Sequence, residues 1–218
     1  MLELYKMSVK PIFFALDSKK LSDFDVELKM LKGHIYGVKV GLELFTSEGP
    51  SAVEELKKDG WNVFLDLKLH DIPNTVQAAT VNAGNIGADF LTIHIASGKE
   101  ALDAAQENKA KNIKILGVSS ALTSKASTPT TSDEVLKDFL IAKESKIDGV
   151  ICPPSEIVST KKLFNLIVTP GIRLENDDID DQKNTTTPEL AIQSGADYLV
   201  MGRSLRNNIE YVIKELKL

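Results

Sequence analysis

The chain has 218 residues, of which 43% are hydrophobic and 26% charged, as in an ordinary globular protein with a sizeable core. The net charge of -5, and the lack of any Lys/Arg run interleaved with aromatic residues, argue against a nucleic-acid partner. No apolar run is long enough for a membrane span or an export signal, so we expect no membrane association.

The single cysteine, Cys152, excludes an intrachain disulfide and is typical of a reducing cytoplasm. It stands in "GVICPP" with no base nearby. We therefore expect it to be a small buried packing residue, and a nucleophile is the less favoured alternative.

Short β-branched and aromatic runs recur along the chain. Most are continuously apolar, which is typical of parallel strands covered on both faces. The predicted strands are residues 12–17, 35–41, 62–68, 90–95, 113–120, 148–153, 164–170 and 197–202.

Amphipathic segments between these strands predict helices. Residues 21–33 and 49–60 both end in glycine, as helix C-termini often do. A helix at 74–88 follows Pro73, one at 132–146 opens with Ser132 as a plausible N-cap, and 205–218 is the last. The alternation predicts an α/β protein with a single (β/α)₈ TIM barrel over 1–218. A doubly wound open sheet is the alternative, but it usually has fewer strands.

Charged residues stand at the carboxyl ends of the first four predicted strands, where barrel active sites lie. These residues are Asp17, Lys39, Asp66, Lys68, Asp71 and His94. Asp66 and Lys68 are two apart on one strand, so they share a face, and we expect that face to point into the barrel mouth. A structural ion-pair network is the alternative. The second and third strands, however, together place four charged residues at their carboxyl ends, which favours a catalytic site. These four are Lys39, Asp66, Lys68 and Asp71.

A phosphate site is predicted after the last two strands, the usual phosphate pocket of such barrels. "TPGIR" at 169–173 and "MGRS" at 201–204 place Gly171 and Gly202 where the backbone could approach an anion. Arg203 offers a charge-assisted, two-pronged contact.

The histidines are weaker candidates. His34 precedes a strand and is expected at the surface, and His70 should face away from Asp66 and Lys68. His94 either lines the site or is structural. The three are too dispersed for a metal site of known spacing, and no dinucleotide or ATP motif is present.

The segment "DLKLHDIPNT" matches the D-x-K-x-x-D-I-P-x-T signature, so the chain resembles the orotidine 5'-phosphate decarboxylase family. The likeness extends to "ALD" at 15–17, "KVG" at 39–41, "LTS" at 122–124, "VTPGIR" at 168–173, "DDQKNTTTP" at 180–188 and "MGR" at 201–203.

The resemblance implies a homodimeric barrel that converts orotidine monophosphate to uridine monophosphate and CO₂, the last step of UMP biosynthesis, with no metal or organic cofactor. Lys68 would protonate the ring carbon that loses the carboxylate, within a catalytic network with Lys39, Asp66 and Asp71. Asp71 and Thr75 would reach the neighbouring subunit's site. The positions implied to bind substrate are Asp17, Lys39, Ile72, Thr75, Thr123, Arg173, Gln182, Gly202 and Arg203, with Ser124 as the alternative to Thr123.

Related barrels leave other functions open. A magnesium-dependent keto-gulonate phosphate decarboxylase resembles the chain at D-x-K-x-x-D, but it carries a metal-binding acid where this chain has Lys39, whose ammonium would repel a divalent cation. A pentose-phosphate epimerase and a non-catalytic nucleotide-phosphate binding barrel are further alternatives. The charge array of Lys68 and Asp71 argues against a pure binder.

The acidic segment 174–188 is expected to act as a mobile lid that closes over the phosphate through Gln182. The alternative is a solvated loop whose acids only maintain solubility.

Overall fold

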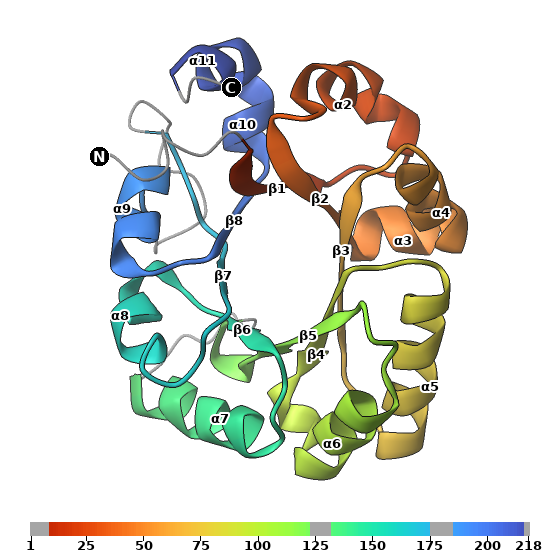
Figure 1. Ribbon diagram of the computed structural model, residues 1–218, viewed down its shortest axis with the longest axis vertical. Coiled ribbons are helices and arrows are strands. Elements are labelled where there is room, and N and C mark those ends of the chain that lie inside the picture. Colours follow the sequence, from red (N-terminus) through yellow and green to blue (C-terminus); the bar gives the residue numbers. More distant parts are fainter. Residues whose placement is uncertain (1–8, 123–131, 175–184, 216–218) are drawn as a thin grey trace.

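The computed structural model describes residues 9–122, 132–174 and 185–215 (Figure 1). In this part of the chain eight parallel strands close into a barrel in sequence order, with β8 paired to β1. Helices surround the barrel on its outside (Figure 1). The predicted (β/α)₈ barrel is confirmed, and an open sheet is excluded. The strands are β1 (Lys10–Leu16), β2 (Ile35–Gly41), β3 (Asn62–Leu69), β4 (Phe90–His94), β5 (Lys114–Val118), β6 (Gly149–Ile151), β7 (Ile167–Thr169) and β8 (Tyr198–Met201).

The helical layer contains α-helices and single 3₁₀ turns. No helix among the described residues has the length and apolar character needed to cross a membrane. The 3₁₀ turns are η1 (Leu21–Phe24), η2 (Ile95–Ser97), η3 (Ser120–Leu122) and η4 (Pro154–Glu156). The α-helices are α2 (Asp25–Leu31), α3 (Leu42–Glu48), α4 (Pro50–Lys58), α5 (Pro73–Asn85), α6 (Lys99–Asn108), α7 (Ser132–Glu144), α8 (Ile157–Thr160), α9 (Pro188–Ser194), α10 (Arg203–Asn207) and α11 (Ile209–Glu215).

The helices agree with the sequence in type but not always in extent. Residues 21–33 form η1 followed by α2, and the last predicted helix divides at Asn208 into α10 and α11. Helices α3, α6, α8 and α9 lie where none was predicted. Three of them have seven residues or fewer, too short for a clear periodic pattern, and α6 buries mainly alanine.

Glycine and proline act at helix ends as predicted. Gly33 and Gly60 follow the ends of α2 and α4 with φ of +82° and +77°, a left-handed conformation that glycine adopts without strain. Pro73 is the first residue of α5, where its missing N–H costs no helical hydrogen bond.

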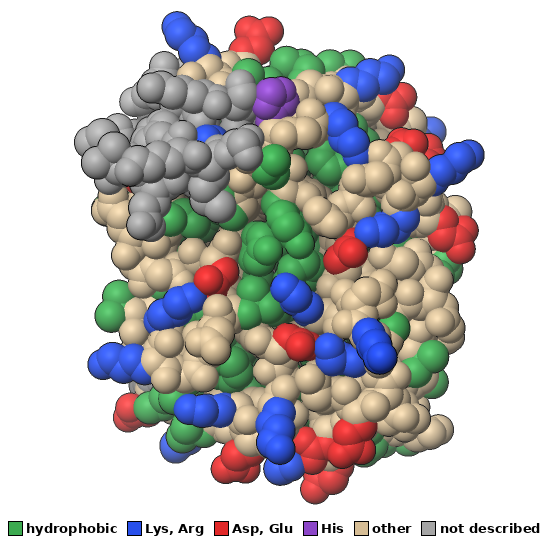
Figure 2. Space-filling view, in the orientation of Figure 1, with side chains coloured by type: hydrophobic (Ala, Val, Ile, Leu, Met, Phe, Trp, Pro, Cys, Tyr) green, Lys and Arg blue, Asp and Glu red, His purple; other side chains and the backbone are tan. Residues whose placement is uncertain are grey.

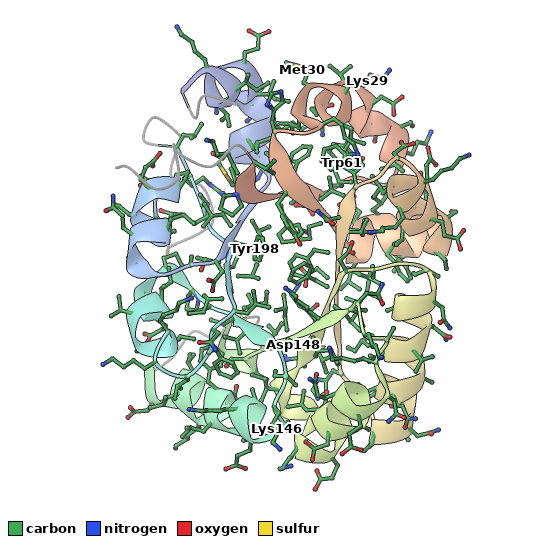
Figure 3. All side chains as sticks on the ribbon, in the orientation of Figure 1. Lys29, Met30, Trp61, Lys146, Asp148 and Tyr198 are labelled. Carbon is green, nitrogen blue, oxygen red and sulfur yellow. The ribbon has the colours of Figure 1, made fainter. Side chains whose placement is uncertain are left out.

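Two hydrophobic layers hold the barrel together. The larger layer lies between strands and helices, and alternate residues of β3 such as Val63 and Leu65 belong to it. The smaller layer fills the barrel interior with aromatic rings in edge-to-face contact, including Phe13 against Phe64 at 5.4 Å between ring centroids. Figure 2 shows hydrophobic side chains at the centre of the molecule over the barrel, and Figure 3 places Tyr198 at its inner wall. The barrel is therefore a packed core whose interior side chains support any site above them.

Three aspartates form a repeated clamp at the amino ends of the strands. Asp89, Asp148 and Asp197 each stand directly before an even-numbered strand, and each accepts a hydrogen bond from a backbone N–H near the start of the preceding strand, at 2.7, 2.7 and 2.8 Å. Each also pairs with a lysine at or near the end of the helix that leads into the earlier of the two strands. These pairs are Lys57–Asp89, Lys109–Asp148 and Lys161–Asp197. The clamp joins strand, helix and strand in three successive pairs of β/α units.

Candidate active site

A cavity of about 260 Å³ lies at the carboxyl ends of the strands. Because the strands are parallel, residues far apart in sequence meet at this end, as their strand-end positions predicted. The residues that line it are Ala15, Asp17, Lys39, Phe64, Asp66, Lys68, Val118, Leu122, Ile151, Pro170, Gly171, Arg173, Val200, Gly202 and Arg203.

The first charged pair joins the ends of β1 and β2. Lys39 Nζ lies 2.9 Å from Asp17 Oδ1, with the lysine side chain 11% exposed and the aspartate 59%. A Cβ atom at Gly41 would approach Lys39 Nζ to 3.0 Å. The lack of a side chain at Gly41 therefore leaves room for this ammonium, a role that sequence reasoning did not assign to it.

The second charged pair lies on β3. Lys68 Nζ is 2.7 Å from Asp66 Oδ2, and both residues line the cavity, so the predicted shared face is confirmed. The strand is not regular there, because Lys68 has φ of +49°, rare for a non-glycine residue. Leu65 pairs with Leu91 and Leu69 with Ile93, so β3 advances four residues while β4 advances two. The pair therefore stands on a bulge, a feature common beside active sites.

Thr92 on β4 connects the two members of this pair and is the main site residue that sequence reasoning missed. Its buried hydroxyl donates to Asp66 Oδ1 at 2.8 Å and accepts from the backbone N–H of Lys68 at 2.9 Å. The signal in the sequence is one polar residue inside the apolar run "FLTIH". That signal is weak, because buried threonines often have structural roles alone.

The loops after β7 and β8 line the other side of the same cavity. Gly171, with φ of +76°, and Arg173 follow β7, while Gly202 and Arg203 follow β8 and begin α10. A Cβ atom at Gly202 would meet only ordinary contacts, the nearest at 3.5 Å, so packing within the protein does not require glycine there. The two predicted loops thus line one cavity, whereas the binding of an anion or phosphate there stays a prediction.

The segment proposed as a lid is anchored beside that subsite at both ends. Arg173 donates its backbone N–H to the Thr186 carbonyl at 3.0 Å, and Leu174 donates to the Ser204 hydroxyl at 3.2 Å. Gln182 lies outside the described residues, as do Thr123 and Ser124; Leu122 before them lines the cavity.

Three predicted substrate-site residues do not line the cavity of this single chain. Asp71, Ile72 and Thr75 are exposed, and Ile72 is 66% accessible. Asp71 Oδ1 accepts the backbone N–H of Ile72 at 2.7 Å. These residues lie at the end of β3 and the start of α5, and their predicted role across a subunit interface stays a prediction.

The histidines and the cysteine lie outside the cavity lining. The rings of His70 and His94 lie 5.3 Å apart, and burial, followed by the charges of His70 and Lys68, lowers the pKa of His94. His34 is partly buried rather than fully at the surface, because it lies beside the start of β1, where its carbonyl accepts from Lys10. Cys152 is fully buried, as predicted, and burial raises the pKa of its thiol to about 12.

The charge balance of the cavity favours an anionic ligand. Lys39, Lys68, Arg173 and Arg203 outnumber Asp17 and Asp66 among the lining residues. Within the described part of the chain, no cluster of three or more His, Cys, Asp or Glu residues could hold a metal ion. The arrangement can bind a small anion at one side and hold a paired ammonium at the other.

Comparisons with known proteins indicate the family of the chain. The model of the "Orotidine 5'-phosphate decarboxylase / HUMPS family" matches residues 10–210. Orotidine 5'-phosphate decarboxylase of Listeria monocytogenes is 38% identical over 90% of this chain and 91% of its own length. That of Trichlorobacter lovleyi is 40% identical over 89% and 87%. The crystal structure of the Lactobacillus acidophilus enzyme of that name has a TM-score of 0.75 at 29% identity, covering 95% of this chain and 99% of the other.

The fold and cavity define a TIM-barrel protein with a charged cavity, in which basic residues outnumber acidic ones, at the carboxyl ends of its strands. The chain belongs to the orotidine 5'-phosphate decarboxylase / HUMPS family.

Proposed function

We propose that the chain is a carboxy-lyase that decarboxylates orotidine 5'-phosphate to uridine 5'-phosphate in pyrimidine biosynthesis, with Lys68 as the proton donor. The observation that carries the proposal is the Lys68–Asp66 pair, preformed at 2.7 Å in a cavity that also holds the Lys39–Asp17 pair and the loops after β7 and β8. The names of the relatives support the substrate.

The reaction breaks the bond between the pyrimidine ring and its carboxyl group. CO₂ leaves, and the bonding electron pair stays on the ring carbon. The Lys68 ammonium stabilises that pair and then transfers a proton to it, and the lysine recovers a proton from solvent. Asp66 would lie beside the departing carboxylate, while Asp17 and Lys39 would hold the ribose.

Lys68 alone is insufficient for the rate. One ammonium about 4 Å from the developing charge contributes roughly 4 kcal/mol at an effective dielectric near 20, whereas enzymes lower barriers by up to about 23 kcal/mol and more for the slowest reactions. Charges already held in place reduce the reorganisation needed during the reaction. Binding of phosphate and ribose would provide most of the remainder.

The phosphate would bind between the loops after β7 and β8. Gly202, Arg203 and Arg173 would contact it, with Gln182 reaching it from segment 174–188 as that segment closes. The anchoring of Arg173 and Leu174 to Thr186 and Ser204 beside the cavity supports this role for the segment.

We further propose a cytoplasmic homodimer in which Asp71 and Thr75 complete the neighbouring subunit's site, with Ile72 in contact with the ligand there. The exposure of all three at the end of β3 supports this arrangement. Thr123 would contact the pyrimidine. The buried thiol of Cys152, the single cysteine, suits a reducing compartment.

Loss of the Lys68 ammonium tests the donor role. Lys68→Ala should abolish decarboxylation, measured as the loss of ultraviolet absorbance of orotidine monophosphate, while uridine monophosphate still binds. Lys99→Ala, which removes an exposed lysine paired with Asp103 on α6, is the control and should match the unmodified enzyme. Near-normal turnover of Lys68→Ala would remove Lys68 from the donor role.

The same assay with a metal chelator separates this function from that of a magnesium-dependent relative. Turnover should be unchanged, because Lys39 occupies the place where a metal-binding acid would be needed. Loss of turnover with the chelator, and its recovery with Mg²⁺, would favour the relative.

The phosphate subsite is tested by Arg203→Ala. This variant should reduce kcat/KM for orotidine monophosphate by about 10²-fold or more, since a charge-assisted contact is lost, and should change the reaction of phosphate-free orotidine little. Arg206→Ala is the matched control, because Arg206 lies on the same helix but pairs with Glu27. Equal losses on both substrates would mean that Arg203 does not bind phosphate.

A further inference from the structure

Three hydrogen bonds connect Lys68, Asp66 and Thr92 in a closed ring. Asp66 Oδ2 binds Lys68 Nζ at 2.7 Å, and Asp66 Oδ1 accepts from the Thr92 hydroxyl at 2.8 Å. Thr92 Oγ1 in turn accepts from the backbone N–H of Lys68 at 2.9 Å. The directions are fixed by chemistry, because an amide nitrogen only donates and an ionised carboxylate only accepts. The Thr92 hydroxyl therefore binds the backbone N–H of Lys68 and the carboxylate of Asp66 at the same time.

The ring lies where the β-ladder is interrupted. The β3–β4 pairing shifts register between Leu65 and Leu69, so Lys68 is outside the regular ladder. In a regular parallel pair a backbone carbonyl would accept its N–H. The side chain of Thr92 takes that place and thereby holds Lys68 at φ of +49°, a conformation that a lysine keeps only when its surroundings determine it.

We propose that Thr92 is a positioning residue that fixes both the backbone from which the Lys68 side chain projects and the carboxylate that orients its ammonium. Thr92 does not line the cavity, so it acts through Lys68 and Asp66 and not by touching the ligand. The inference rests on the proposed donor role of Lys68. It extends that role by assigning the geometry of the donor to a residue on the neighbouring strand.

Thr92→Val tests the proposal, because it keeps the shape of the side chain and removes both hydrogen bonds. We expect kcat to fall about 10- to 100-fold, since a small displacement of a catalytic group costs this much. KM should stay within about threefold, because the loops after β7 and β8 are unchanged. Thr92→Ser retains the hydroxyl and should restore kcat to within about threefold of the unmodified enzyme.

Thr80→Val provides the control for removing a buried threonine hydroxyl. Thr80 lies on α5, and its hydroxyl donates to the Val76 carbonyl at 2.8 Å, away from the cavity. It should leave kcat and KM unchanged. If Thr92→Val does not fold, Thr92→Ser and Thr92→Ala give the same comparison, because they differ by the hydroxyl alone.

Three results would overturn the proposal: an unchanged kcat for Thr92→Val, an increase in KM alone, or equal losses in the valine and serine variants. Lys68→Ala assayed in parallel separates this proposal from the donor role. Turnover by Lys68→Ala would reject the donor itself. An inactive Lys68→Ala beside a fully active Thr92→Val would reject only the positioning role.

Discussion

Lys68 shows how a single residue can have a conformation that its own preferences disfavour. A left-handed backbone costs a lysine roughly 1–3 kcal/mol, and partial burial of its ammonium adds a desolvation cost. The Asp66 carboxylate and the Thr92 hydroxyl offset these costs locally. Strain and charge are thus concentrated at the end of β3, where the proposed chemistry needs an oriented ammonium.

Cys152 illustrates the opposite case, a residue made inert by burial. Its pKa is raised from 9.0 to about 12 because burial disfavours the thiolate. Between these two pH values the unfolded chain has lost the thiol proton and the folded chain has kept it. The free energy of unfolding should therefore decrease with rising pH across this range, by at most about 1.4 kcal/mol per pH unit from this group.

Denaturant unfolding at several pH values between 8 and 11 checks this expectation for Cys152→Ala against the unmodified chain. The variant should be less stable at pH 8 because of its cavity, but its stability should decrease less steeply with pH. Burial also raises the pKa of Tyr198, so part of the alkaline loss should remain in both proteins. Parallel slopes would show that Cys152 does not contribute.

At the scale of elements, the aspartate clamps show how strand and helix are joined at the end of the barrel away from the cavity. Asp148, labelled in Figure 3, stands directly before β6. It accepts from the Ile115 N–H of β5 at 2.7 Å and pairs with Lys109 after α6. Asp89 and Asp197 repeat the pattern. The pair of β1 and β2 has no such aspartate. His34 stands before β2 in its place, and its backbone carbonyl accepts from the Lys10 N–H at the start of β1.

Asp148→Ala should lower the free energy of unfolding by about 1–3 kcal/mol, because a strand N–H and an ammonium both lose a partner. Activity per folded molecule should be unchanged, since the clamp lies at the opposite end from the cavity. Denaturant unfolding and the decarboxylation assay measure the two effects. Lys99→Ala, which breaks the exposed Lys99–Asp103 pair within one helix, is the control and should cost less than about 0.5 kcal/mol.

At the scale of the whole molecule, the proposed dimer divides each site between two chains. The exposed Asp71 would come from one chain and Lys68 from the other. Lys68→Ala and Asp71→Ala should each be inactive alone. Mixed in equal amounts and allowed to exchange subunits, they should regain about a quarter of full activity, because half the dimers are hybrids with one intact site.

The measurement is the decarboxylation rate of the mixture against each variant alone. Lys68→Ala mixed with Lys68→Ala/Asp71→Ala is the control and should stay inactive, since no intact site can form. Absence of recovery, with subunit exchange verified by mass, would place Asp71 in the site of its own chain.

Much of the fold could be predicted because it depends on local patterns. Continuous apolar runs indicated every strand, and glycine or proline marked the ends of α2 and α4 and the start of α5. Short helices such as α8 could not be predicted, because four residues show no periodicity. The division at Asn208 was missed because α10 and α11 together read as one amphipathic helix.

The sequence by itself determined the (β/α)₈ barrel, the end of it at which the site lies, and the charged residues that line the site, since strand alternation and strand-end position depend on chain order alone. Only the tertiary structure revealed the bulge at Lys68, the bridging hydroxyl of Thr92 and the space left by Gly41. Each of these depends on the register between neighbouring strands, which is set when the whole barrel closes. No pattern within a single segment contains that register.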